Sequence, residues 1–298
     1  MIGRPVDTLP PRGSLGLLEE IGLRGGGCAL NTASALARLG LRAGVAGKVG
    51  ADPLGTFLLG LLDERGVDRA GVVRDPEAAT SASIVLVGGD GERTFLHAVG
   101  ADGSLRAEEL DPERLYAGRC LHVGGALVLE ELDGEPLAAI LAEAGRRGLV
   151  TSLDTTWDPS GRWHRVEPLL AHVDLACPSL AEAQAIAGEE DPAGAAAWFR
   201  ERGVGTVALT AGPDGCYADA PGFSGWVPAP PVVAVDGTGA GDAFAAGLLH
   251  ATLAGRPVEE ALGFACAAGA LATRAVGAYE GVGDLEETAV LAASRRAS

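Results

Sequence analysis

Asp236-Gly237-Thr238-Gly239-Ala240-Gly241-Asp242-Ala243-Phe244 is the most informative stretch of this 298-residue sequence. It follows a β-branched run of strand length at residues 232–235 and leads into an Ala- and Leu-rich segment at 243–253. We therefore expect a strand, a glycine-rich turn and a helix, in that order. The first amides of a helix lack intrahelical partners and lie at the positive end of its dipole, so the turn predicts an anion site.

Asp242 is the unusual residue of this turn, because a carboxylate repels a bound phosphate unless it takes part in chemistry or a cation lies between them. In phosphoryl transfer, one carboxylate orients the attacking hydroxyl and accepts its proton. The stretch also fits an ordinary turn in which Asp242 only complements the helix dipole. From these residues alone, both interpretations remain open.

Apolar runs and helical segments alternate through most of the chain. We expect strands at 43–49, 121–123, 150–153, 173–176 and 206–210, and helices at 54–65, 135–147, 165–170, 180–187 and 193–202. This alternation predicts right-handed βαβ crossovers and a doubly wound, mainly parallel α/β sheet. Two runs at 83–87 and 94–99 flank the hairpin signal Gly88-Gly89-Asp90-Gly91-Glu92. With residues 15–23, whose pattern fits a strand or a short helix, this hairpin predicts a small separate sheet.

Composition limits the partners that the chain can bind. Its net charge of -17 argues against nucleic acid and anionic membranes, which both need basic patches. Because Lys48 is the only lysine, a phosphate would be held by backbone amides, arginines and metal. Five cysteines without a C-x-x-C pair predict reduced thiols and a cytoplasmic location, and no apolar run is long enough to predict a membrane span.

Three further motifs carry polar side chains at expected element ends. Asn31 follows Gly25-Gly26-Gly27 at the start of an expected helix that Gly40 ends, and its amide suits a polyhydroxylated ligand or a helix cap. Thr210-Ala211-Gly212-Pro213-Asp214-Gly215 follows a strand, at the sheet edge where open α/β folds bind ligands. Glu182, in the first turn of the next expected helix, is positioned to reach a metal ion or its water shell.

Taken together, these motifs resemble the ribokinase-like (PfkB) family of sugar and nucleoside kinases. The order and spacing match over nearly the whole chain, with residues 50–55 and Gly100-Ala101-Asp102 also part of the pattern. The resemblance implies one ribokinase-like domain over residues 1–298, a three-layer αβα fold with a small β-sheet lid from segments near 12–24 and 80–99. It also implies ATP-dependent phosphorylation of a hydroxyl on a small sugar, with Mg²⁺ and, as in several members, K⁺.

The resemblance further implies a role for each matching residue. Asp242 would be the catalytic base, Gly239, Ala240 and Gly241 the anion hole, and Asp7, Gly27 and Asn31 the sugar contacts, while Thr210, Gly212 and Gly215 would bind the nucleotide, Glu182 would hold Mg²⁺ through water, and Asp236 would bind a monovalent cation. The sequence departs from the family pattern at Gly237, usually Thr, and at Ser179, usually Asn. The Gly3 to Asp7 spacing is about a residue short, and the 275–282 loop lacks a common proline.

Two other functions remain open from the sequence. The segment 28–33 has some likeness to the nucleoside kinases, although an aromatic content of 4% offers few residues for stacking a base. A non-catalytic sugar- or nucleotide-binding regulator of the same fold is the second alternative. Among sugars, ribose, fructose and a keto-deoxy acid fit equally. Because lid sheets of relatives pair with one another, a homodimer through the lid is also expected.

Overall fold

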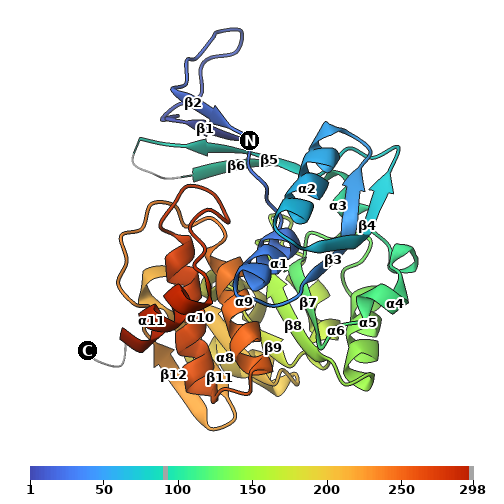
Figure 1. The fold of residues 1–298 in the computed structure, drawn as a ribbon, viewed down its shortest axis with the longest axis vertical. Helices are drawn as coiled ribbons and strands as arrows, with labels where there is room; N and C mark the ends of the chain where they lie inside the picture. Colours follow the sequence, from blue (N-terminus) through green and yellow to red (C-terminus); the bar gives the residue numbers. More distant parts are fainter. Residues whose placement is uncertain (90–92, 295–298) are drawn as a thin grey trace.

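The computed structural model describes residues 1–89 and 93–294, and a six-stranded sheet forms its centre (Figure 1). The strand order is β12-β11-β10-β9-β8-β7. The strands are β7 (Cys120–Ala126), β8 (Val150–Thr155), β9 (Leu175–Ala176), β10 (Thr206–Thr210), β11 (Cys216–Ala220) and β12 (Phe223–Val227). The first four are parallel, as the alternation of strands and helices predicts, and β11 and β12 add an antiparallel hairpin.

Helices cover both faces of this sheet, which confirms the three-layer fold. One layer contains α1 (Cys28–Arg38), α9 (Ala240–Leu253), α10 (Val258–Ala272) and α11 (Leu285–Ser294); the other contains α5 (Glu135–Arg146), α6 (Glu167–Leu170), α7 (Leu180–Ala187) and α8 (Pro192–Glu201). Strand alternation explains the two cores: Ala208 packs with α9 and α10, whereas its neighbours Val207 and Leu209 pack with α5 to α8. No helix of the described residues is long and apolar enough to cross a membrane.

A second unit of βαβ type lies beside this sheet. It consists of β3 (Gly44–Gly50), α2 (Pro53–Glu64) and the parallel strand β4 (Asp68–Asp75). Of these three elements, only β4 was not predicted from the sequence. Asp52 caps α2, since its side chain accepts from the Gly55 amide at 2.8 Å. The remaining short elements are α3 (Gly100–Gly103), α4 (Pro112–Leu115) and the 3₁₀ turns η1 (Ala107–Glu109), η2 (Trp163–Val166) and η3 (Gly212–Asp214).

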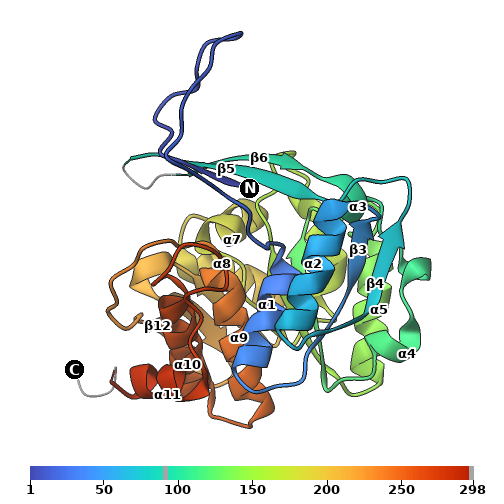
Figure 2. The ribbon, with the colours of Figure 1, turned by 45° about the horizontal axis from the view of Figure 1, so that its top comes forward.

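The small separate sheet is present and stands apart from the helix layers (Figures 1 and 2). Its order is β2-β1-β5-β6, from β1 (Ile2–Arg4), β2 (Glu20–Gly22), β5 (Ala82–Val87) and β6 (Arg93–Ala98). β5 and β6 pair antiparallel as the hairpin signal predicts, although its turn at 90–92 lies outside the described residues. Residues 15–23, whose sequence pattern fits either a strand or a short helix, contain the strand β2, which pairs antiparallel with β1.

The prediction of a strand at residues 232–235 is wrong. These residues run as a loop, with Val233 87% exposed, and α9 begins three residues earlier than its expected apolar start at 243. Pro228, Pro230 and Pro231 precede this run and have no amide hydrogen to donate to a sheet. The amides of Val235 and Asp236 donate instead to the carbonyl of Thr273, at the end of α10.

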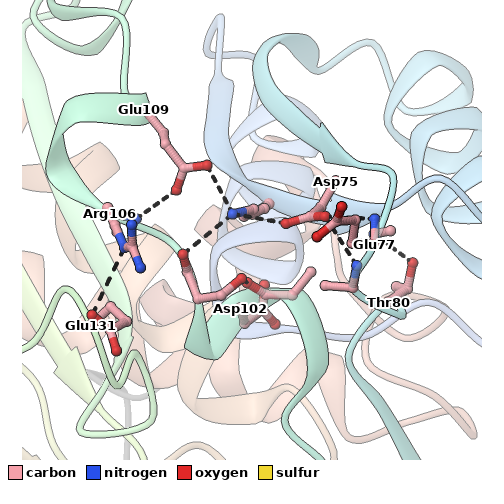
Figure 3. Close-up of polar contacts among 12 residues, drawn as sticks. Asp75, Glu77, Thr80, Asp102, Arg106, Glu109 and Glu131 are labelled. Atoms are coloured by element: carbon pink, nitrogen blue, oxygen red, sulfur yellow. Dashed lines mark hydrogen bonds and ion pairs between the residues drawn. The ribbon is translucent and has the colours of Figure 1, made fainter.

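Lys48 connects the small sheet to the body of the fold. Its side chain is 7% exposed, and its Nζ lies 3.0 Å from Asp75 Oδ2 and 2.8 Å from Glu109 Oε1. Figure 3 shows both carboxylates pointing toward one centre. Nζ also donates to the carbonyl of Ser104 at 3.3 Å. Because Asp75 precedes the small-sheet hairpin and Ser104 and Glu109 follow it, one ammonium group holds both connections.

Thr80 forms a second anchor at the entry to β5. Its hydroxyl donates to Asp52 Oδ1 at 2.7 Å and accepts from the Gly50 amide at 2.9 Å, while its own amide donates to Asp52 Oδ2 at 2.8 Å. One residue further, the Ser81 hydroxyl donates to the carbonyl of Val99. The two hairpin connections are therefore tied to β3, to α2 and to each other.

We expect Lys48→Met to lower the free energy of unfolding by about 1 to 3 kcal/mol, because it leaves Asp75 and Glu109 close together without a cation. This loss of stability is smaller than the loss expected for a fully buried ion pair, because the Glu109 side chain remains 28% exposed. Lys48→Arg, which keeps the charge, should lose less. Urea unfolding followed by circular dichroism measures both variants, and equal stability of Lys48→Met and the parent chain would contradict this role.

Candidate functional site

The turn before α9 takes its shape from a glycine. Gly239 caps the helix with φ +77°, a left-handed conformation that strains other residues. A Cβ at Gly239 would lie 2.6 Å from the carbonyl oxygen of Ala278 and 2.8 Å from its Cα. Gly241, two residues later, has open space where a Cβ would be. The Ala240 amide donates to the Gly237 carbonyl at 3.2 Å, and the open space at Gly241 leaves room for an anion at the start of α9.

Asp242 and Asn31 meet at the junction of α9 and α1. Asn31 Nδ2 donates to Asp242 Oδ2 at 2.9 Å, and Asp242 is only 8% exposed. Burial raises the pKa of Asp242 to about 6, while hydrogen bonds from Asn31 and Cys28 act in the opposite direction. Asn31 Oδ1 is buried and has no partner among the described residues. A base with a pKa near neutrality thus lies beside an amide oxygen that is available to a hydroxyl donor.

Asp154 adds a buried carboxylate that the sequence reading missed. It belongs to β8, at the carboxyl edge of the sheet, and burial together with the charges of Asp242 and Glu182 holds its pKa well above the usual range. Glu182 Oε2 accepts from the Ser179 amide and the Thr155 hydroxyl, each at 3.0 Å. Such repulsion between carboxylates favours a bound cation. Mg²⁺ usually keeps several waters and takes only one or two carboxylates from a protein. The described residues contain no group of three His, Cys, Asp or Glu side chains that could hold a metal ion.

Asp236 ties the glycine-rich turn to the loop after α10. Its Oδ1 accepts from the Thr238 amide at 2.9 Å and the Thr238 hydroxyl at 2.7 Å, and its Oδ2 accepts from the Gly277 amide at 2.9 Å. Together with the close approach of Gly239 to Ala278, these bonds hold the two loops in contact. The assignment of Asp236 to a monovalent cation stays a prediction.

A cleft of about 710 Å³ lies between the small sheet and the glycine-rich turn. Residues of the small sheet that line it include Ile2, Arg4 and Val85, and residues 235–238 line the opposite side. Asp7 lies at the small-sheet side of this region, where its Oδ1 accepts from the Gly89 amide at 2.7 Å. The structure therefore places Asp7 just after β1, next to the end of β5. Gly27 caps α1 with φ +101°, one turn before Asn31. The sugar contact assigned to Asp7 stays a prediction.

Thr210, Gly212 and Gly215 form a turn that links β10 to β11. Gly212 and Gly215 have φ values of +57° and +96°, and a Cβ at Gly215 would collide with the carbonyl of Val227. Thr210 forms a parallel bridge with Ser179, three residues before Glu182. This turn thus belongs to the same sheet edge as Glu182 and Asp154, and its assignment to the nucleotide stays a prediction.

Two site residues could have been found from simple spacing rules. Asp154 directly follows the expected strand 150–153, and strand ends at the carboxyl edge are where open sheets place functional groups. Cys28 precedes Asn31 by three residues, so the two share one side of α1. Asp154 lies outside the glycine-rich turns, whereas Cys28 lies between the Gly25-Gly26-Gly27 turn and Asn31.

The chain is similar to known proteins in sequence and in fold. Residues 3–284 match the model of the pfkB family of carbohydrate kinases. A fructokinase of Klebsiella pneumoniae is 36% identical over 93% of this chain and 94% of its own length, and a 2-dehydro-3-deoxygluconokinase of Bacillus subtilis is 30% identical over 91% and 87%. A crystal structure from E. coli, described as a ribokinase II candidate with ATP and Mg²⁺, has a TM-score of 0.83 and 25% identity over 98% of each chain.

The two glycines before Asp242 should respond differently to alanine. Gly239→Ala should reduce the free energy of unfolding by about 1 to 3 kcal/mol, because it adds backbone strain and a collision with Ala278. Gly241→Ala should keep stability, since its Cβ meets no protein atom, yet weaken nucleotide binding because the methyl group enters the open region. Urea unfolding and calorimetric ATP titration of both variants test this pair. Unchanged ATP binding in a stable Gly241→Ala variant would contradict the anion-site assignment.

Proposed function

The chain belongs to the pfkB family of carbohydrate kinases, and we propose that it transfers the γ-phosphate of ATP to a hydroxyl group of a small sugar. The hydrogen bond between Asn31 and Asp242 at the start of α9 is the observation that carries this proposal. It brings a buried carboxylate and an amide with a free oxygen to the point where the helix amides face an open region. A sugar hydroxyl and a phosphate can therefore meet at one place.

Asp242 is the base of this proposal. With its pKa near 6, the carboxyl group is mostly ionised at neutral pH and still basic enough to take a proton as the hydroxyl oxygen attacks phosphorus. Asn31 holds one carboxylate oxygen and presents Oδ1 to a second sugar hydroxyl. The amides of Gly239, Ala240 and Gly241, at the positive end of the α9 dipole, stabilise the charge on the transferred phosphoryl group.

Glu182 and Asp154 would hold Mg²⁺ through its water shell. The raised pKa of Asp154, caused by burial and by the charges of Asp242 and Glu182, supports this assignment, since a nearby cation would favour the ionised form of Asp154. When bound, Mg²⁺ neutralises charge on the ATP phosphates. A monovalent cation at Asp236 is an expectation from the family alone. The five free thiols and the use of ATP favour the cytoplasm.

The small sheet acts as a lid in this proposal. It forms one wall of the cleft opposite residues 235–238, so closure over a bound sugar excludes water, which would otherwise accept the phosphoryl group. The acceptor class is a fructose-like ketose or a keto-deoxy sugar acid, in keeping with the two most informative relatives. These names favour a sugar over a nucleoside.

The proposal is tested by ADP release in a coupled assay over pentoses, hexoses, keto-deoxy acids and nucleosides. We expect turnover with at least one sugar, and a loss of about 10² to 10⁴-fold in kcat for Asp242→Asn with ATP affinity nearly unchanged, because only the base is removed. Asp63→Asn, on the surface of α2, is the matched control. ATP binding without turnover on any acceptor would favour a regulator, and turnover on nucleosides alone a nucleoside kinase.

We also propose a homodimer through the outer face of the lid sheet. Ile84 and Leu96 lie opposite each other in the β5–β6 pair, and Gly3 pairs with both Ile21 and Leu86, so these apolar residues share one face. Ile21, Ile84 and Leu96 are 71%, 43% and 53% exposed. The neighbouring residue Val85 points to the cleft instead. An apolar sheet face of this kind is suited to pair with a second copy.

Sedimentation velocity tests the dimer. The parent chain should sediment as a dimer and Leu96→Asp as a monomer, because a carboxylate on the apolar face would be desolvated on association. Val290→Asp, an equally apolar and exposed position on α11, should leave the dimer intact. A monomeric parent chain at micromolar concentration would contradict the proposal, as would a dimer that persists in Leu96→Asp.

A further inference from the structure

The cleft-facing side of the small sheet has an apolar part and a charged part. Ile2 of β1 pairs with Val85 of β5, and both residues line the cleft together with Val87. Arg4 lies two residues after Ile2 on β1, so it is on the same side of the sheet, and it also lines the cleft. This wall of the cleft is therefore apolar at one end of β1 and charged at the other.

Arg4 holds the carboxylate of Glu20 in a fixed orientation. The two residues are directly opposite each other in the β1–β2 pair. Nε and Nη2 of Arg4 both donate to Oε2 of Glu20, at 2.9 and 2.6 Å. Among the described residues, no side chain or amide donates to the second oxygen, Oε1. The ion pair thus leaves one carboxylate oxygen available to a ligand in the cleft.

Negative charge predominates on the walls of this cleft. Among the lining residues whose side chains the structure describes, Arg4 carries the only positive charge, and Glu20 already neutralises it. Glu19, beside Glu20, and Asp236, in the opposite wall, add two further carboxylates. A ligand that enters the cleft therefore meets three carboxylates and one guanidinium group that is already paired.

We propose that this wall selects an uncharged sugar as the phosphoryl acceptor, with Glu20 accepting hydrogen bonds from its hydroxyl groups. This inference rests on the proposed kinase function, and it favours the ketose over the keto-deoxy sugar acid. Sugar hydroxyls donate to carboxylates, and the C–H groups of a sugar pack on apolar side chains such as Ile2 and Val85. An acceptor with its own carboxylate would lie beside Glu19 and Glu20, and such like-charge contacts select against a ligand.

Closure of the small sheet increases this discrimination. In the structure, the side chains of Arg4 and Glu20 are 42% and 47% exposed, so water screens their charges. When the sheet closes over a bound acceptor, water leaves the cleft and the repulsion between two carboxylates grows. Selection against a sugar acid is therefore strongest in the closed complex, and it should appear in kcat/KM.

Fructose and 2-ketogluconate are a matched pair of acceptors for the first test. They differ only at C1, where the first has a hydroxymethyl group and the second a carboxylate. At saturating ATP and low salt, kcat/KM should be at least about tenfold higher for fructose, and added salt should reduce this preference by screening the repulsion. If any sugar acid of the acceptor panel exceeds every uncharged sugar in kcat/KM, the selectivity is wrong and the kinase function stands.

Glu20→Gln tests the contribution of one carboxylate, because it removes the charge and keeps the shape. We expect kcat/KM to fall about two- to fivefold for fructose, mainly through KM, and to rise by a similar factor for 2-ketogluconate. Glu201→Gln, at the end of α8 and outside the cleft, is the matched control and should change neither value. An equal change with both acceptors in Glu20→Gln would show that this carboxylate does not discriminate by charge.

Calorimetric titration in the presence of Mg²⁺ and ADP measures the same selectivity without turnover. Fructose should bind about tenfold more tightly than 2-ketogluconate. If no acceptor is phosphorylated but this preference holds, the kinase function fails and the selectivity stands. Tighter binding of 2-ketogluconate that is lost in Arg4→Gln would overturn the proposal, because Arg4 would then leave Glu20 to bind the acid. Failure of every uncharged sugar of the panel to bind would overturn it as well.

Discussion

The hydrogen bond from Asn31 to Asp242 joins residues that are 211 positions apart in the sequence, and the arrangement of the site depends on it. It requires α1 and α9 to pack side by side on one face of the main sheet with their first turns at the same end. Gly27 and Gly239, both with positive φ, let the chain enter these turns. The loop after α10 then holds the second turn through Asp236 and Ala278. A small number of backbone constraints therefore brings a carboxylate, a side-chain amide and the start of α9 together.

Much of this arrangement could be predicted from the sequence because its signals are local. The βα alternation identified β7 to β10, and the bounds of α7 and β10 are the expected ones. Gly-rich turns before helices identified Asn31 and Asp242. The failures have physical causes: residues 232–235 have strand composition, but the prolines before them remove ladder donors, and α10 is so uniformly apolar and small that it lacks a helical period. Asp154 lies at the end of an expected strand, where spacing alone could have found it, but its electrostatic interaction with Asp242 and Glu182 depends on the packing of separate elements.

The site gathers several acidic side chains, which the net charge of the chain alone does not reveal. Asp242 and Glu182 lie close enough to Asp154 for their charges to raise its pKa, and the chain contains a single lysine. That lysine, Lys48, forms its ion pairs with Asp75 and Glu109 and joins the two connections of the small sheet. Charge in the site is thus left to be balanced by helix amides and by what binds there. This division suits a site whose ligands bring both phosphates and a divalent cation.

Lys48 also has a consequence for chemical labelling. It carries the only side-chain amine of the chain, and that amine is held by Asp75 and Glu109, whose hydrogen bonds keep it protonated. A lysine-directed reagent can therefore react with Lys48 only after its ion pairs with the two carboxylates have opened. Modification at this one position consequently reports the opening of the small-sheet connections, with no other lysine to obscure the signal. The rate at which Lys48 is modified would therefore measure how often these connections open.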